Sequence, residues 1–68
     1  MDEDRKVDLN EANFAELVLV PGIGCTTAEK IIRYRIEHGP FAEAADLDDI
    51  EGIGPRKIQR MLPFIKVE

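Results

Sequence analysis

The hydrophobic residues of this chain recur three or four positions apart, which is the spacing of helices. Two runs show the pattern: Phe14, Leu17 and Val18, and then Ala28, Ile31, Ile32 and Ile36. Residues at these intervals share one side of a helix, so each run predicts an amphipathic helix. No segment alternates apolar and polar residues as a half-buried strand would. We expect helices at about residues 11–19, 25–38, 44–50 and 55–62, and no strand.

Cap and breaker residues agree with these bounds. Asn10 is predicted as the N-cap of the first helix, and Gly39 followed by Pro40 should end the second. Pro55 suits the first position of the last helix, and Pro63 should close it.

The chain contains an internal sequence repeat. Gly-Ile-Gly stands at residues 22–24 and again at residues 52–54, an offset of thirty. At this offset the neighbouring residues also match in type. The matched pairs are Leu17 with Leu47, Val20 with Ile50, Ile23 with Ile53, Lys30 with Arg60, Ile31 with Met61, and Ile32 with Leu62.

Each Gly-Ile-Gly predicts a tight hairpin before a helix, the first at residues 21–24 and the second at residues 51–54. Two glycines allow a sharp turn that residues with a Cβ resist, while the central isoleucine anchors the turn in the core. Without side chains in the way, amide N–H groups of the next helical turn can point outward. The positive end of the helix dipole then favours an anion, and a phosphate is the natural ligand.

Composition fits one small domain. The chain has 68 residues, of which 44% are hydrophobic, and its single cysteine, Cys25, cannot form an internal disulfide. We expect an acidic, flexible segment at residues 1–6 and a single domain at residues 7–68. The net charge of −5 argues against a simple electrostatic nucleic-acid binder, but the charges are segregated. Residues 40–51 hold five acidic and no basic side chains, whereas residues 52–68 hold four basic side chains and one acidic.

Neither catalysis nor a tightly bound metal is indicated. The acidic cluster at residues 46–51 lacks the ligand pattern of a calcium loop, and no Cys/His set is present for zinc. Cys25 has no base partner and is expected to be a packed or idle thiol, while His38 at a helix end offsets the helix dipole. The sequence shows no signal peptide and no membrane span, which leaves a cytoplasmic location or an excised extracellular domain open.

The stretches VDLNEANFAELVLVPGIG, IIRYRIEHGPF and DLDDIEGIGPRKI resemble the tandem helix-hairpin-helix domain of ComEA-type competence DNA receptors. The resemblance covers about residues 7–66 and implies an all-α, compact bundle of four main helices with an internal pseudo-repeat. It implies DNA uptake by sequence-independent binding of double-stranded DNA through hairpin amides, with no enzymatic activity and no cofactor. It also allows a monovalent cation at hairpin carbonyls.

Two departures from the family pattern matter. Lys57 occupies the position three residues after the second glycine, where the family often has lysine, but Thr27 stands there in the first copy. The second hairpin is therefore the better predicted DNA site, although Thr26 and Thr27 can still donate to phosphate. Ala42 and Glu43 stand where a Ser or Thr often caps the third helix, which predicts a weak helix start.

The candidate phosphate-binding residues come from the two hairpins and the helices that follow them. Arg35 is assigned a structural role instead, with its stem on the core edge and its head on loop carbonyls. The candidates are Gly22, Ile23, Gly24, Thr26, Thr27, Lys30, Arg33, Gly52, Ile53, Gly54, Arg56, Lys57 and Arg60.

Two other interpretations stay open at this point. The sequence also resembles the extrinsic lumenal subunit of photosystem II, in which the same fold serves protein assembly, so the acidic surface at residues 43–51 could dock a basic partner. The chain could also be a targeting module of a larger nuclease or repair protein. Other domains of a longer chain are potential partners in either case.

Overall fold

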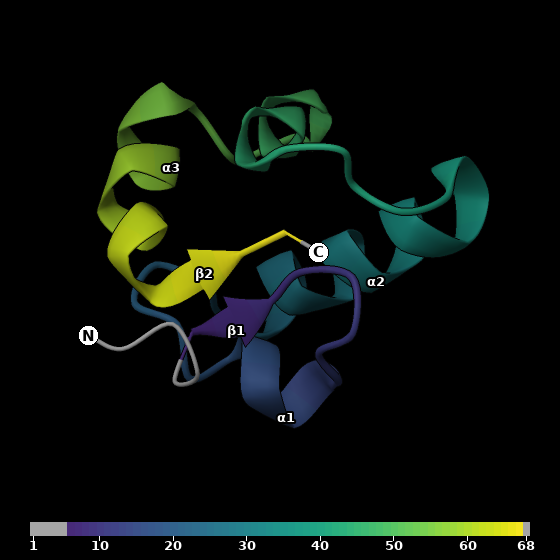
Figure 1. Cartoon of the computed structure of the whole chain (residues 1–68), viewed down its shortest axis with the longest axis horizontal. Helices are drawn as coiled ribbons and strands as arrows, with labels where there is room; N and C mark the ends of the chain where they lie inside the picture. Colours follow the sequence, from purple (N-terminus) through teal and green to yellow (C-terminus); the bar gives the residue numbers. More distant parts are fainter. Residues whose placement is uncertain (1–5, 68) are drawn as a thin grey trace.

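The computed structural model describes residues 6–67 and shows a bundle of short helices closed by one small strand pair. Figure 1 shows the elements in the order β1, α1, α2, η2, α3, η3 and β2, where η marks a 3₁₀ helix. Their bounds are Val7–Asp8, Phe14–Leu17, Cys25–His38, Ala44–Asp49, Pro55–Met61, Leu62–Phe64 and Ile65–Lys66. The all-α class is confirmed. Residues 1–5 of the segment predicted as flexible lie outside the described residues.

The core takes one or more side chains from nearly every element. Its fully buried large members are Leu9, Leu17, Ile31, Leu47 and Met61. None of the buried side chains among residues 6–67 is polar or charged. Burial of apolar surface, at about 25 cal/mol per Å², therefore holds the described part of the chain together.

The two copies of the sequence repeat make equivalent backbone hydrogen bonds. In the first unit the N–H of Ile23 donates to the carbonyl of Val20 at 3.0 Å, and in the second the N–H of Ile53 donates to Ile50 at 3.1 Å. The first bond of α2 runs from Ala28 to Gly24, and the first bond of α3 runs from Ile58 to Gly54. The offset of thirty therefore marks two copies of one hairpin.

The prediction of Asn10 as a helix N-cap is wrong. Its side chain instead clamps the main chain of Phe41, accepting from the Phe41 N–H at 2.6 Å and donating to the Phe41 carbonyl at 3.0 Å. Helix α1 is capped by Asn13, which accepts from the N–H of Glu16 while the Glu16 carboxylate accepts from the N–H of Asn13. This reciprocal capping box delays the start of the helix to Phe14.

A two-residue parallel strand pair, β1 with β2, corrects the expectation of no strand. Val7 lies opposite Ile65 and Asp8 lies opposite Lys66, and the N–H of Leu9 extends the ladder to the Lys66 carbonyl. Segments this short have no room for the alternation that would signal a strand. The pair joins the two ends of the described chain, side by side in Figure 1.

The third predicted helix is a 3₁₀ helix, η2. Ala44, Leu47 and Ile50 follow one another at intervals of three, and this period places all of them toward the core. The Asp46 carboxylate accepts from the N–H groups of Ala42 at 2.9 Å and Glu43 at 3.2 Å, which ties the residues before η2 to its first turn. These donors do not belong to the helix, so the bonds do not replace a Ser or Thr cap, and the weak start stays a prediction.

Candidate nucleic-acid interface

The first glycine of each hairpin has the conformation that a tight turn requires. Gly22 has φ = 95° and Gly52 has φ = 94°, both in the left-handed region that residues with a Cβ avoid. The isoleucines that follow, Ile23 and Ile53, are each only 4% exposed, so the predicted anchoring in the core is confirmed. Because their N–H groups donate within the turn, the amides of these two isoleucines are not free to bind a phosphate.

The second glycine of each hairpin has a different role from the one predicted. Gly24 has φ = −93° and Gly54 has φ = −108°, which any residue adopts, and both are helix N-caps. A Cβ added at either position would meet no heavy atom within 4 Å among the described residues. These glycines are therefore not needed for the turn, and they leave the approach to the helix N-terminus open.

The start of α2 presents uncapped amide donors. The first intrahelical bond is made by the N–H of Ala28, and Gly24 has no side chain to cap the earlier ones. The N–H groups of Cys25, Thr26 and Thr27 are therefore left for an outside acceptor. Thr26 is exposed and Thr27 is half-buried, so the Thr26 hydroxyl is the more accessible of the two.

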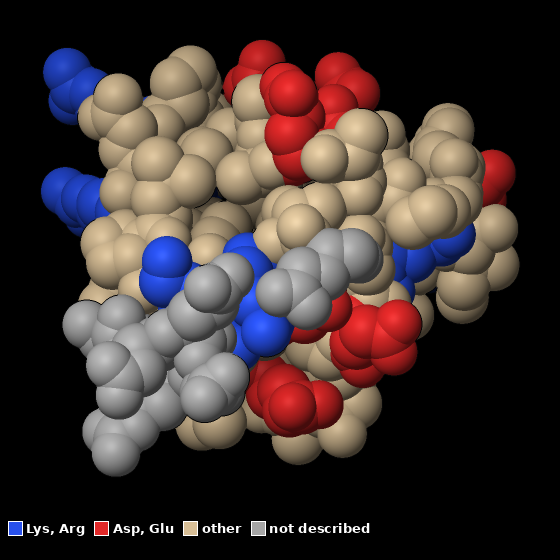
Figure 2. Space-filling view, in the orientation of Figure 1, with Lys and Arg blue, Asp and Glu red and all other residues tan. Residues whose placement is uncertain are grey.

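The start of α3 offers fewer amides and more charge. Pro55 at its first position has no N–H, which leaves Arg56 and Lys57 as uncapped helical donors. Arg56, Lys57 and Arg60 are exposed, and none of their side chains makes a hydrogen bond or ion pair within residues 6–67. Figure 2 shows Lys and Arg side chains projecting from the edge where α3 lies, apart from the acidic side chains over η2.

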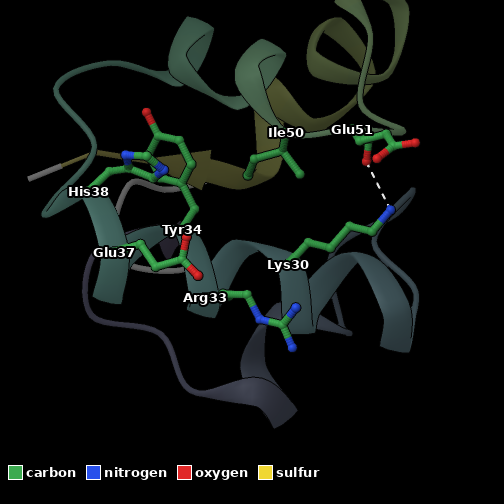
Figure 3. Close-up of a pocket in the computed structure, with 7 residues that line it drawn as sticks. All are labelled: Lys30, Arg33, Tyr34, Glu37, His38, Ile50 and Glu51. Carbon is green, nitrogen blue, oxygen red and sulfur yellow. Dashed lines mark hydrogen bonds between the residues drawn. The ribbon is translucent and has the colours of Figure 1, made fainter.

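Lys30 joins the two repeats. Its side chain leaves α2 and its ammonium donates to the carbonyl oxygen of Glu51 at 3.1 Å, as Figure 3 shows. The same Nζ would lie 3.7 Å from a Cβ at Gly52. Lys30, a candidate phosphate-binding residue, is therefore already bonded to the second hairpin, although its ammonium keeps further donors. No local pattern indicates this contact, which links residues 21 positions apart.

The two predicted sides of α2 are otherwise found, except that Ile36, predicted on the apolar side, is 78% exposed. Thr26, Arg33 and Glu37 are exposed, while Ala28 and Ile31 are buried. On the inner side, Arg35 donates from one guanidinium nitrogen to the carbonyls of Leu9 at 2.9 Å and Ala12 at 2.6 Å. The structural role predicted for Arg35 is thus confirmed.

An aromatic cluster beside Lys30 and Arg33 was missed at the level of the sequence. The Tyr34 ring stacks on Phe41 at a centroid distance of 4.7 Å and contacts the His38 ring at 4.6 Å. The Tyr34 hydroxyl donates weakly to Asp49 at 3.5 Å. Burial of the ring and the neighbouring carboxylates, Asp49 before Asp46, raise the pKa of the Tyr34 phenol above its ordinary value. Lys30, Arg33, Tyr34 and His38 line one side of a shallow hollow against Ile50 (Figure 3).

The remaining candidates are readily placed. Cys25 is a free, exposed thiol at the start of α2, so it is not packed. His38 is the last residue of α2, as its predicted interaction with the helix dipole requires. Among residues 6–67, no group of three or more His, Cys, Asp or Glu side chains could hold a metal ion. A monovalent cation at hairpin carbonyls stays a prediction.

No helix of the described chain has both the length and the apolar character to cross a membrane.

Each repeat consists of a tight hairpin that is anchored in the core and followed by an uncapped helix start, which is the arrangement of a helix-hairpin-helix domain. The helix-hairpin-helix motif family matches residues 2–66 of the chain. The chain belongs to this family, and the resemblance to ComEA-type domains is confirmed by its similarity to ComE operon protein 1 of Bacillus subtilis (strain 168). The two are 36% identical over 62 residues, which cover 91% of this chain and 30% of that protein.

Two further relatives carry the same domain within much longer chains. Kinesin-like protein KIF22 of Mus musculus is 39% identical over 54 residues, covering 79% of this chain and 8% of the relative. Endonuclease/exonuclease/phosphatase family domain-containing protein 1 of Rattus norvegicus is 38% identical over 56 residues, which cover 82% of this chain and 10% of the relative. The chain thus spans less than a third of each of these three relatives.

Proposed function

We propose that this domain binds double-stranded DNA without sequence specificity, mainly through backbone amides of its two hairpins. Membership of the helix-hairpin-helix family and similarity to ComE operon protein 1 support nucleic-acid binding in general. We further propose that it captures DNA as the competence receptors it resembles do, and that it has no catalytic activity of its own.

The observation that carries the proposal is the open approach to both helix starts. Gly24 and Gly54 cap α2 and α3 without a side chain, and no described heavy atom lies within 4 Å of where a Cβ would stand. A phosphate oxygen can therefore approach the uncapped amides, where the helix dipole also attracts negative charge. Two such starts, one in each repeat, suit two phosphates of a duplex.

The proposed interface favours phosphates over bases. Backbone amides and the exposed cations Arg56, Lys57 and Arg60 recognise the sugar-phosphate chain, which is alike at every step of a duplex. Arg33 adds a cation from α2, and Lys30 contributes by fixing the second hairpin while keeping spare donors. The overall charge of −5 weakens binding at long range, so we expect a micromolar or poorer dissociation constant.

Valine at the two N-cap glycines tests this function. In Gly24→Val/Gly54→Val the added Cβ atoms meet no described heavy atom within 4 Å and the backbone angles are ordinary, so the fold should persist, which circular dichroism checks. Titration of a fluorescein-labelled duplex, followed by anisotropy, should show binding by the wild type and little by this variant. The control Ala15→Val/Ala42→Val introduces two valines at exposed positions outside the hairpins and should bind as the wild type does.

Two outcomes would count against the proposal. One is unchanged duplex affinity in Gly24→Val/Gly54→Val with wild-type circular dichroism. The other is a strong preference among duplexes of scrambled sequence, because phosphate recognition should vary by less than the roughly 1–3 kcal/mol that one mismatch costs a base-reading protein.

A further inference from the structure

A shallow apolar groove separates η2 from α3. Its volume is about 350 Å³, near the lower end of the roughly 300–1,000 Å³ found for ligand sites, so it has room for one or two large side chains. Helix η2 contributes Ala44, Ala45 and Asp48, α3 contributes Pro55, Ile58 and Gln59, and η3 contributes Leu62. The two alanines leave the groove open because their side chains are only methyl groups. Leu62, on the other side of the groove, is 45% exposed.

One carboxylate at this groove is unengaged. Asp46 accepts two N–H groups at the start of η2, and Asp49 accepts from the Tyr34 hydroxyl. Asp48 is exposed and lines the groove, and its carboxylate makes no hydrogen bond or ion pair within residues 6–67. Residues 40–51 contain no basic side chain to neutralise it, and Figure 2 shows acidic side chains gathered over η2.

We propose that this groove docks a basic protein segment carrying an apolar side chain next to Lys or Arg. The apolar side chain would lie over Ala45 and against Leu62, which replaces water on an exposed apolar surface. The neighbouring cation would pair with Asp48, and this charge complementarity would select basic over acidic segments. A nucleic acid does not suit the groove, because a phosphate chain would be repelled by the carboxylates of η2.

The groove is separate from the proposed DNA-binding surface. Pro55 and Ile58 lie on one side of α3 and Leu62 begins η3 directly after it, whereas Arg56 and Arg60 lie more than about 90° around α3 from Pro55. A segment in the groove therefore leaves these cations exposed. The inference does not rest on DNA binding, and the domain could hold a duplex and a basic partner together.

A designed peptide tests the inference. The probe is a fluorescein-labelled peptide of Lys-Lys-Leu-Lys repeats, titrated with the domain and followed by anisotropy. Ala45→Gln fills the groove and Asp48→Lys reverses its charge, so each should raise the dissociation constant about tenfold or more. The matched controls Ala15→Gln and Glu11→Lys make the same changes at exposed positions elsewhere and should stay within about twofold of the wild type.

The peptide itself supplies a second comparison, which does not depend on the folding of any variant. Replacing its leucines by serine should weaken binding to the wild-type domain about tenfold. Equal effects of Asp48→Lys and Glu11→Lys would overturn the inference, since they would show only attraction to the net charge. A concentration-dependent dimer in sedimentation that Ala45→Gln abolishes would also overturn it, in favour of a second copy in the groove. Duplex binding is measured separately, and its loss would leave this inference standing.

Discussion

The ammonium of Lys30 in α2 lies 3.1 Å from the carbonyl oxygen of Glu51, which begins the second hairpin. The first hairpin is contacted from the other repeat as well, because a Cβ at Gly22 would lie 3.8 Å from Met61 in α3. Each hairpin is therefore supported by a helix of the opposite repeat. The support of the second hairpin is polar, and that of the first is apolar.

Lys30→Met should loosen the second hairpin selectively. The variant removes the hydrogen bond to Glu51 but keeps most of the apolar stem, so we expect a loss of about 0.5–1.5 kcal/mol in the free energy of unfolding. Hydrogen exchange of the Ile53 amide should accelerate, while the equivalent amide of Ile23 keeps its protection. Arg33→Met is the control on the exposed side of α2 and should change stability by less than about 0.5 kcal/mol. Equal acceleration at both amides would contradict the assignment.

Alanine substitutions should divide the four hairpin glycines into two groups. Gly22→Ala and Gly52→Ala force a Cβ into a left-handed conformation and should each destabilise the fold by about 1–2 kcal/mol. Gly24→Ala and Gly54→Ala meet neither strain nor contact, so they should be close to neutral. Urea unfolding measures all four. A uniform loss at every position would mean that the second glycines also serve the turn.

Stability should fall in alkali in a way that depends on Tyr34. The pKa of its phenol is raised in the folded protein, so the ionised form is disfavoured there relative to the unfolded chain. The contribution of the protonated Tyr34 phenol to the free energy of unfolding is fully present below the ordinary tyrosine pKa of about 10. It is lost as the pH rises above that value. Tyr34→Phe should therefore lose less stability than the wild type between about pH 8 and pH 11. Identical urea midpoint curves against pH for the two proteins would refute this.

The two hairpins should contribute unequally to duplex binding. Replacing Arg56, Lys57 and Arg60 by alanine removes three exposed cations and should weaken binding about tenfold or more at low salt. Replacing Thr26 and Thr27 by alanine removes no charge and leaves the amides of α2 in place, so its effect should be much smaller. The first hairpin has the larger number of free amides, since Pro55 lacks an N–H. A greater effect of the threonine pair would show that the threonine hydroxyls matter more than the three cations and would contradict this ranking of the hairpins.

Most of the fold could be predicted from the chain because its signals are local. The repeated Gly-Ile-Gly, the apolar spacing along α2 and Pro55 at a helix start each act within one or two turns. The capping box of Asn13 and Glu16 was equally visible as an Asn followed three residues later by Glu. Asn10, directly before Glu11, offers a competing cap.

The rest depends on contacts between distant residues. Asn10 bonds to Phe41 and Lys30 bonds to Glu51, and neither partner can be identified from spacing alone. The strand pair of Val7 with Ile65 is set by the closing of the whole chain. The different roles of the first and second glycines of each hairpin become visible only in their backbone angles, because both are simply glycines in the sequence.

The salt dependence of duplex binding tests the central claim most directly. If three or four phosphates are neutralised by exposed cations such as Arg33, Arg56, Lys57 and Arg60, the slope of log K against log salt should be roughly −3 to −4. Affinity should then fall roughly a hundredfold between about 50 and 200 mM salt. Anisotropy titration of the wild-type domain with a labelled duplex across this range gives the slope. A folded domain that shows no salt-dependent duplex binding at tens of micromolar protein would contradict the account.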